Sequence, residues 1–141
     1  MTNKYYKKLI LGLMVMAFLV LAGFQSVVKV EAKIKDGNYY EYYSGMKDSS
    51  GIYKMRLKKK ELVIWGSLMQ IDSKTGKVLE NLKYKKRSVS IAKNMEIYSI
   101  DEGQQYPITK KQFKKQCKKG YGGCFINIKI ENGKVVSIGI S

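Results

Sequence analysis

The sequence contains no histidine, and it has only two cysteines, one proline and one tryptophan among its 141 residues. Without histidine there is no Ser–His or Cys–His nucleophile pair and no imidazole to carry a proton or bind a metal. Two cysteines are too few for a four-thiolate zinc site. The nucleotide-binding patterns G-x-x-x-x-G-K-[ST] and G-x-G-x-x-G are also missing. These absences exclude the commonest nucleophilic, metal-dependent and nucleotide-binding enzymes, and we expect no cofactor.

Acidic residues are also scarce, because 11 Asp and Glu face 27 Lys and Arg, and the formal charge is +16. Glycosidase chemistry needs two carboxyl groups flanking the scissile bond, and no pattern in the sequence selects such a pair. Asp48, Asp72 and Asp101-Glu102 all have the sequence context of turns. We therefore expect a protein that is not an enzyme, with a hydrolase that uses an unrecognised carboxylate pair as the alternative.

The first 32 residues have the three-part layout of a secretory signal. Lys4, Lys7 and Lys8 precede the uncharged run 9–24, and Val30-Glu31-Ala32 offers a signal-peptidase site. A helix of this length rises about 24 Å, less than the roughly 30 Å hydrocarbon core of a bilayer. Cleavage after Ala32 is therefore favoured over a retained membrane anchor, and no transmembrane segment is expected to remain.

The segment 21–24 resembles a bacterial lipobox, but Phe24 occupies the position of the cysteine that would receive the lipid. Since phenylalanine has no thiol, the product is predicted to be secreted and not a lipoprotein, either free or associated with the cell wall by charge. Cleavage removes four Lys and one Glu, so 109 residues with a charge of +13 remain. A chain of about 100 residues can bury roughly 60–70% of its unfolded surface, which suffices for one small core.

The predicted mature chain alternates apolar and polar residues along most of its length, as β-strands do. Strands are expected at 38–43, 51–57, 61–71, 83–91, 95–100, 125–131 and 134–140, with 83–91 and 95–100 forming one strand or two. The most apolar run, 61–71, should be a central strand with Trp65 in the core and a bulge or sharp bend at Gly66. Asn132-Gly133 predicts a type I′ hairpin turn.

One segment has the spacing of a helix. Thr109 and Gln112 match a capping box, and Ile108 and Phe113 match the hydrophobic staple of the same helix start. Gly120 fits the position just after a helix end, so we expect a helix over 110–119.

The predicted fold class is therefore mostly β with one short helix, a small β-barrel or roll in a single domain, 33–141. The element order, β-β-β-(β)-α-β-β, resembles that of the oligonucleotide/oligosaccharide-binding (OB) fold, in which a helix lies between the third and fourth strands. A generic closed barrel or a roll with one helix fits the same order.

Cys117 and Cys124 both follow the predicted cleavage site, and an extracellular compartment favours disulfides. Gly120, Gly122 and Gly123 let the intervening chain fold back tightly. A structural disulfide is therefore expected, and in the chain-entropy model it would stabilise the fold by roughly 2.5 kcal/mol. A redox-active pair is the alternative, although active dithiols are more often spaced as C-x-x-C.

The predicted helix is strongly basic and is the main candidate binding site. Like charges four residues apart each cost about 0.2–0.5 kcal/mol, so such a helix either has strong tertiary support or meets a polyanion. A solvated face that only confers solubility is the alternative. The candidate residues are Lys110, Lys111, Lys114, Lys115, Lys118 and Lys119.

The type of cation narrows the ligand class. The predicted mature chain carries 21 Lys but only Arg56 and Arg87. Arginine supplies the planar fork that reads guanine edges and clamps phosphates, whereas lysine is a hydrated point charge. Sequence-specific nucleic-acid recognition is therefore disfavoured, and loose, salt-sensitive attraction to a wall polymer, an anionic lipid, a glycan or stray DNA is favoured.

A run of tyrosines is a second candidate surface. In a strand Tyr40 and Tyr42 share one face, and Tyr39, Glu41 and Tyr43 share the other. An aromatic platform of Tyr40 and Tyr42 could stack on sugars or bases. The alternative is that both rings are half-buried strand residues with their hydroxyls in water.

The end of the chain reads ITKKQFKKQCKKGYGGCFINIKIENGKVVSIGIS over Ile108–Ser141, with ELVIWGSL at 61–68 as a shorter second match. This pattern resembles small lysine-rich secreted proteins of Gram-positive gut anaerobes. The resemblance implies secretion and a small, mostly β domain, and it brings no catalytic residues or function. The two cysteines have no counterpart in it.

These observations predict a secreted, non-enzymatic module with a basic surface that associates with anionic cell-envelope or extracellular polymers. A protein-interaction domain, such as an inhibitor or a host-directed effector, is the first alternative. An OB-like binder of single-stranded nucleic acid is the second.

Overall fold

A computed structural model describes residues 33–47, 49–120 and 122–141. The predicted signal, 1–32, lies outside the described residues. Within these ranges the chain forms seven strands and one helix, which confirms the mostly β class. In chain order these are β1 (Gly37–Tyr43), β2 (Ile52–Leu57), β3 (Glu61–Ile71), β4 (Val78–Asp101), β5 (Gln104–Pro107), α2 (Lys110–Lys119), β6 (Cys124–Glu131) and β7 (Lys134–Ile140).

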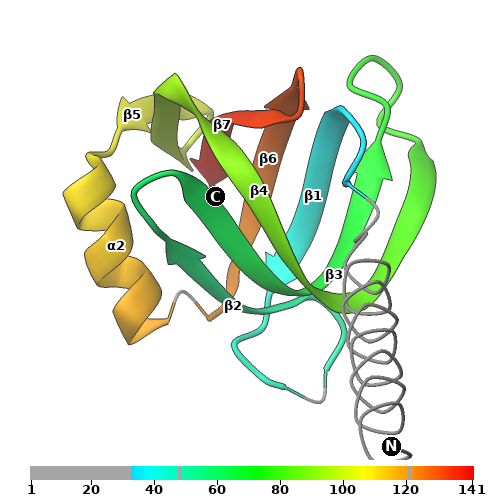
Figure 1. Cartoon of the computed structure of the whole chain (residues 1–141), viewed down its shortest axis with the longest axis horizontal. Coiled ribbons are helices and arrows are strands. Elements are labelled where there is room, and N and C mark those ends of the chain that lie inside the picture. Colours follow the sequence, from blue (N-terminus) through cyan, green and yellow to red (C-terminus); the bar gives the residue numbers. More distant parts are fainter. Residues whose placement is uncertain (1–32, 48, 121) are drawn as a thin grey trace, which may run out of the picture. The chain divides into compact units, whose positions relative to one another are not determined.

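Five of the strands close into a ring in the order β3-β1-β6-β7-β4, because β4 pairs with both β7 and β3 (Figure 1). Neighbours in the ring are antiparallel except for β4 and β7, which are parallel. The helix α2 falls between the third and fourth ring strands in chain order. This is the small barrel with an OB-like element order that the sequence predicts.

The strand β2 extends β1 rather than adding a strand to the ring. Tyr43, the last residue of β1, pairs in parallel with Ile52, the first residue of β2. Both strands then pair with β3, β1 near its end and β2 near its start. The loop 44–51 therefore interrupts what is in effect one long first strand.

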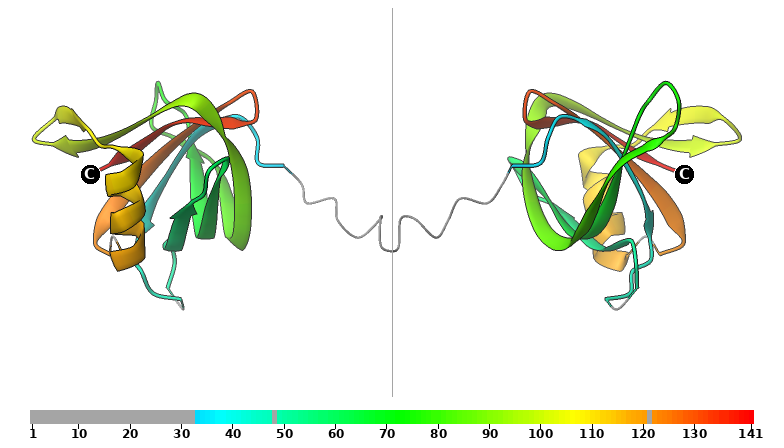
Figure 2. Two further views of the ribbon diagram at one scale, coloured as in Figure 1. Left: turned by 60° about the vertical axis from the view of Figure 1, so that its left-hand side comes forward. Right: turned by 90° about the vertical axis from the view of Figure 1, so that its right-hand side faces the viewer.

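The segments 83–91 and 95–100, left open as one strand or two, belong to the single 24-residue strand β4. Its first part pairs with β3, and its last residues pair with β7 and β5. A register shift against β7 between Ile91 and Glu96 accompanies the sweep of β4 around the barrel (Figure 2). The short strand β5, which no pattern predicted, forms a hairpin with the end of β4.

The barrel interior is an apolar cluster, and no polar or charged side chain is buried in the part of the chain that the structure describes. The face of β1 predicted for Tyr39 and Tyr43 is the inner one, since both side chains are 1% exposed. At the terminal hairpin, Asn132 and Gly133 both have positive φ, in agreement with the predicted turn.

Trp65 was expected in the core, and this prediction is wrong. Leu62, Ile64 and Leu68 of β3 point into the barrel and are at most 1% exposed. Because neighbouring side chains of a strand point to opposite faces, Trp65 lies on the outer face, where it pairs with Lys86 of β4. The predicted irregularity at Gly66 is confirmed, because the β3–β4 register shifts between Gly66 and Leu68.

The helix α2 begins and ends at the predicted residues. The Gln112 backbone N–H donates to the Thr109 hydroxyl (3.1 Å), and the Thr109 N–H donates to the Gln112 side-chain oxygen (2.9 Å), which completes the capping box. Phe113 and Cys117 form its buried face. Ile108 packs against the same core cluster, so the helix is attached to the barrel by an apolar contact on one side only.

Candidate anion-binding surface

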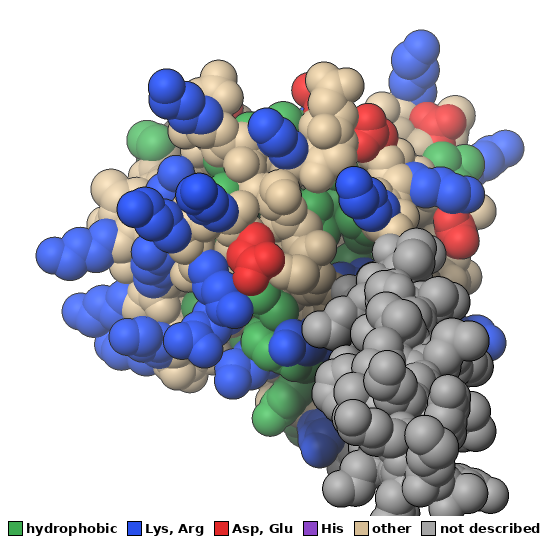
Figure 3. All heavy atoms as spheres, in the orientation of Figure 1, with side chains coloured by type: hydrophobic (Ala, Val, Ile, Leu, Met, Phe, Trp, Pro, Cys, Tyr) green, Lys and Arg blue, Asp and Glu red, His purple; other side chains and the backbone are tan. Residues whose placement is uncertain are grey.

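The outer side of α2 is a lysine face. The six predicted lysines, Lys110, Lys111, Lys114, Lys115, Lys118 and Lys119, are all exposed. The ion pairs found within the described ranges join other residues, Lys58 to Glu61 and Lys129 to Glu131. Figure 3 shows Lys and Arg side chains gathered over the end of the barrel where α2 lies. The charges of this helix are therefore available to a ligand.

A hollow of about 460 Å³ lies between α2 and β2. Lys114 and Lys118 line it from the helix, and Lys54 and Arg56 line it from the strand. The rest of the lining is Met55, Leu57 and Cys117. Four cations surround an apolar floor and no carboxylate lines the hollow, so its potential is strongly positive.

Trp65 continues this surface across the outer face of the sheet. The Lys54 ammonium lies 5.1 Å from the indole centroid and the Lys86 ammonium 5.5 Å from it, both within cation–π range. The register produces this arrangement, because Lys54, Trp65 and Lys86 stand opposite one another on β2, β3 and β4. Lys54 thus connects the hollow to an aromatic ring.

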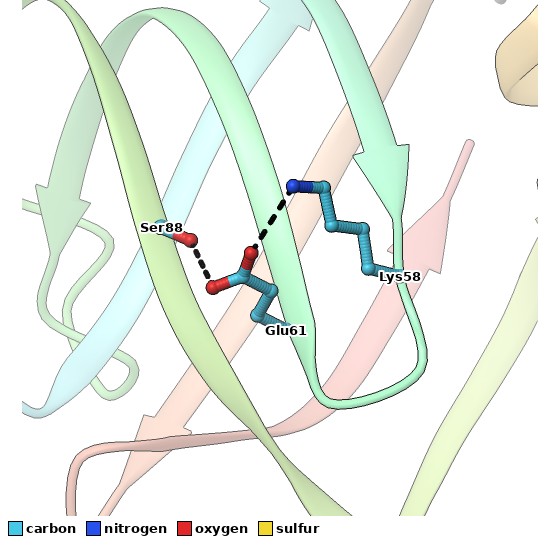
Figure 4. Close-up of polar contacts among 3 residues, drawn as sticks. All are labelled: Lys58, Glu61 and Ser88. Atoms are coloured by element: carbon cyan, nitrogen blue, oxygen red, sulfur yellow. Dashed lines mark hydrogen bonds and ion pairs between the residues drawn. The ribbon is translucent and has the colours of Figure 1, made fainter.

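One carboxylate on this face is already engaged. Glu61 accepts a hydrogen bond from the Ser88 hydroxyl (2.6 Å) and pairs with the Lys58 ammonium (3.4 Å) (Figure 4). The Ser88 hydrogen bond and then Lys58 hold the pKa of Glu61 below its usual range. Glu61 therefore stays ionised beside Lys58 and Lys86, whereas no ion pair among the described residues involves Lys54 or Arg56.

The tyrosine face contains a residue that the sequence did not identify. Tyr40 and Tyr42 lie on the outer face of β1 as predicted, and Phe125 of β6 joins them. The rings of Tyr40 and Phe125 stack at 5.1 Å, and Tyr42 meets Phe125 edge-on at 5.2 Å. Tyr42 and Phe125 are each 41% exposed, so an aromatic patch exists there, and its binding to sugars or bases stays a prediction.

The predicted disulfide is absent from the structure, where Cys117 and Cys124 are free thiols. Cys117 belongs to the apolar core beside Phe113, and Cys124 packs against that core from the start of β6. The helix thus uses Cys117 as a small apolar side chain. Burial raises the pKa of Cys117 to about 12 and also raises the pKa of Cys124, which makes both thiols poor nucleophiles.

We expect these thiols to resist alkylation while the protein is folded. With a pKa of about 12 for Cys117, its thiolate fraction near neutral pH is about a thousandfold below that of an ordinary cysteine. Iodoacetamide labelling followed by intact mass measurement should therefore add two groups only after unfolding in denaturant. Rapid labelling of the folded protein would contradict the burial, and no labelling after unfolding would mean that the cysteines are bridged.

The described residues form no group of three or more Asp, Glu, His or Cys side chains that could hold a metal ion. Within the same ranges no helix is long and apolar enough to span a membrane. No Asp or Glu side chain lines the hollow between α2 and β2.

No protein-family model, no curated protein and no solved structure matches this chain. The resemblance to lysine-rich secreted proteins therefore stays a prediction. Within the site, sequence reasoning found the α2 lysines but missed Lys54, Arg56, Trp65 and Lys86. Their alternation along the strands was visible, but the pairing that places them side by side was not.

Proposed function

We propose that this chain is a secreted, non-enzymatic binding module that associates with anionic polymers of the cell envelope or of the extracellular surroundings. The observation that supports it most directly is the hollow lined by Lys54, Arg56, Lys114 and Lys118. A solvated face that serves only solubility does not require cations from two separate elements to converge on one concavity. The predicted signal at 1–32 and the missing lipobox cysteine support release from the cell or retention at the wall by charge.

The choice of cation supports a broad ligand class. Three of the four cations are lysines, which act as hydrated point charges without a fixed geometry. Such a site attracts phosphate, carboxylate and sulfate groups alike, so a wall polymer, an anionic lipid surface or a glycan suits it better than one base sequence. The affinity then depends on counterion release and falls steeply with salt.

A second function is favoured by a different observation. The OB-like barrel carries an outward-facing Trp65 between Lys54 and Lys86, and single-strand binders combine such stacking rings with cations. A single-stranded nucleic acid is therefore the second candidate ligand.

We expect the protein to bind purified wall polymer and whole cells at low salt and to lose that binding as salt rises. Trp65 is the sole tryptophan, so its fluorescence reports binding near Lys54 and Lys86 directly. If four cations contact the polymer, affinity should fall about 50-fold between roughly 50 and 200 mM NaCl. Binding that is absent at low salt, or indifferent to salt, would overturn the proposal.

A matched pair of variants separates the hollow from overall charge. The Lys114→Gln/Lys118→Gln variant removes two cations from the hollow, and Lys74→Gln/Lys77→Gln removes two from the β3–β4 turn. The first should weaken binding and flatten its salt dependence, and the second should change both far less. A single-stranded oligonucleotide that binds more tightly than heparin of equal charge would favour the second function.

A further inference from the structure

The outer face of β1, β6 and β7 carries a row of side chains to which neither the basic hollow nor Trp65 belongs. Strand pairing aligns one residue from each of four neighbouring strands across the barrel wall. From β4 to β1 these residues are Tyr98, Gly139, Asn127 and Tyr40. The row faces outward, because the chain neighbours Ile97, Ile126 and Tyr39 lie in the core and successive side chains of a strand point to opposite faces.

The hydroxyl end of the Tyr98 side chain lies against Gly139. A Cβ added at position 139 would lie 2.8 Å from the Tyr98 Cε2 and 3.1 Å from its hydroxyl oxygen. Gly139 does not have a positive φ, so the backbone there would accept another residue and the close contact is with the ring. The missing side chain therefore lets the Tyr98 ring lie close to the sheet, beside Asn127, which pairs with Gly139 from β6.

Asn127 places an amide between aromatic rings. Neither this amide nor the hydroxyls of Tyr40 and Tyr98 hydrogen bond to another residue of the described ranges, and all three side chains are partly exposed. Tyr40 also stacks on Phe125, which meets Tyr42 edge-on. The face thus combines aromatic surface with hydrogen-bond donors and acceptors that are available to a ligand.

This face is poor in charge, although the chain carries a formal charge of +16. The row and the neighbouring pair of Tyr42 and Phe125 contain no charged side chain. On the other side of the row, the register places Glu96 of β4 and Lys129 of β6 on either side of β7, and Lys129 also pairs with Glu131 at 3.0 Å. The charges nearest the row are therefore of both signs, which favours a neutral ligand over a polyanion.

We propose that the outer face of β1, β6 and β7 binds a neutral oligosaccharide. The C–H face of a pyranose ring is apolar and weakly positive, which matches the negative face of an aromatic ring. Sugar hydroxyls both donate and accept hydrogen bonds, and the Asn127 amide does both as well. From Tyr98 to Tyr40 the row crosses three strand spacings, about 14 Å along the sheet, which accommodates a few linked sugar rings.

This site is distinct from the basic surface, and its ligand is uncharged, so the proposal goes beyond association with anionic polymers. OB-fold proteins bind their ligands chiefly at the second and third strands of the barrel. Those strands are β3 and β4 here, with Trp65 on the outer face of β3. A nucleic acid is a poor occupant of the row of Tyr98, Asn127 and Tyr40, because its phosphates would meet no row of cations there.

The test titrates the whole protein with cellotetraose, chitotetraose and mannotetraose by calorimetry and NMR. We expect at least one of them to bind, with an affinity that stays within about twofold between roughly 50 mM and 1 M NaCl because no charge is involved. Binding should shift the side-chain amide resonances of Asn127. If none binds, or if binding leaves the Asn127 amide unchanged, the proposal is wrong, while salt-sensitive polymer binding at the basic surface still stands.

A contact between copies is a separate outcome. Asn127 resonances that move with protein concentration in the absence of sugar would show that this face is covered by a second copy, and they would overturn the proposal.

Alanine variants locate the stacking. Tyr98→Ala should weaken sugar binding about tenfold by removing a ring. Tyr84→Ala removes a ring that is 45% exposed from the part of β4 that pairs with β3, and it should leave the affinity unchanged. Lys114→Gln/Lys118→Gln should also leave it unchanged. Equal losses from Tyr98→Ala and Tyr84→Ala would overturn the assignment of the face.

Gly139→Ala tests the position of the Tyr98 ring rather than its presence. The added methyl would meet the end of a flexible side chain, so the ring can move away from the sheet and the fold is kept, which circular dichroism checks. Gly139→Ala should weaken binding about as much as Tyr98→Ala, and the double variant should lose no more than either. Wild-type affinity in Gly139→Ala, or losses that add in the double variant, would mean that the ring against Gly139 does not hold the sugar.

Discussion

Replacing Phe113 with alanine is expected to lower the free energy of unfolding by about 3–5 kcal/mol. Phe113 is fully buried, at 0% exposure, and with Cys117 it forms the buried face of α2. The remaining helix surface consists of lysines and glutamines that have no core to enter. Truncation would leave a cavity and remove most of the apolar contact that attaches the helix to the barrel.

The consequence is large because small domains are stable by only about 5–15 kcal/mol in total. Urea unfolding followed by far-UV circular dichroism measures the change, and Gln116→Ala, at an exposed position of the same helix, is the control. Gln116→Ala should shift stability by about 0.5 kcal/mol or less. A loss below about 1 kcal/mol for Phe113→Ala would mean that α2 is not held by this side chain.

Replacing Gly66 with alanine is expected to destabilise the barrel by several kcal/mol or to prevent folding. Gly66 has a φ of 149°, and an added Cβ would lie 2.4 Å from the Gly51 carbonyl oxygen and 2.6 Å from the Ile52 Cα. Those atoms are backbone and cannot rotate away. Hydrogen bonds hold both sides of this contact in place. The Gly51 carbonyl accepts from the Ser67 N–H, and the Gly66 carbonyl accepts from the Arg87 guanidinium.

Gly76→Ala provides the matched control. Gly76 also has a positive φ, 70°, but nothing lies within 4 Å of an added Cβ. It should therefore show only the conformational cost, about 1–3 kcal/mol, and the difference between the two variants isolates the crowding at Gly66. Thermal and urea unfolding measure the loss of stability in both variants. Equal losses would contradict the close approach of β2 to β3 at Gly66.

Local chemistry made the helix and the terminal hairpin predictable. The capping box at Thr109 and Gln112 depends on contacts within one helical turn, so the sequence alone predicted its start. Gly120 marked the end of the helix. Asn132-Gly133 predicted the terminal hairpin, because the positive φ values of its turn depend on the two turn residues themselves. Gly66 was recognisable as a bend because glycine inside an apolar strand has few other roles.

The side on which a residue lies was less predictable. Trp65 sits in the most apolar strand, and hydrophobicity placed it in the core, whereas the alternation of Leu62, Ile64 and Leu68 placed it outside. The alternation decided the outcome, because a strand cannot turn one side chain against its period. The outward indole is tolerated because Lys54 and Lys86 cover it.

The sequence by itself determined the mostly β class, the basic character and the bounds of α2, because these depend on composition and on contacts between near neighbours. Only the tertiary structure decided the closure of the ring, the continuity of β4, the free thiols of Cys117 and Cys124, and the hollow between β2 and α2. Each of these depends on pairing between segments far apart in the chain. Lys54 and Lys118 line the same hollow because the barrel brings β2 beside α2. No local sequence pattern predicts that these two elements are neighbours.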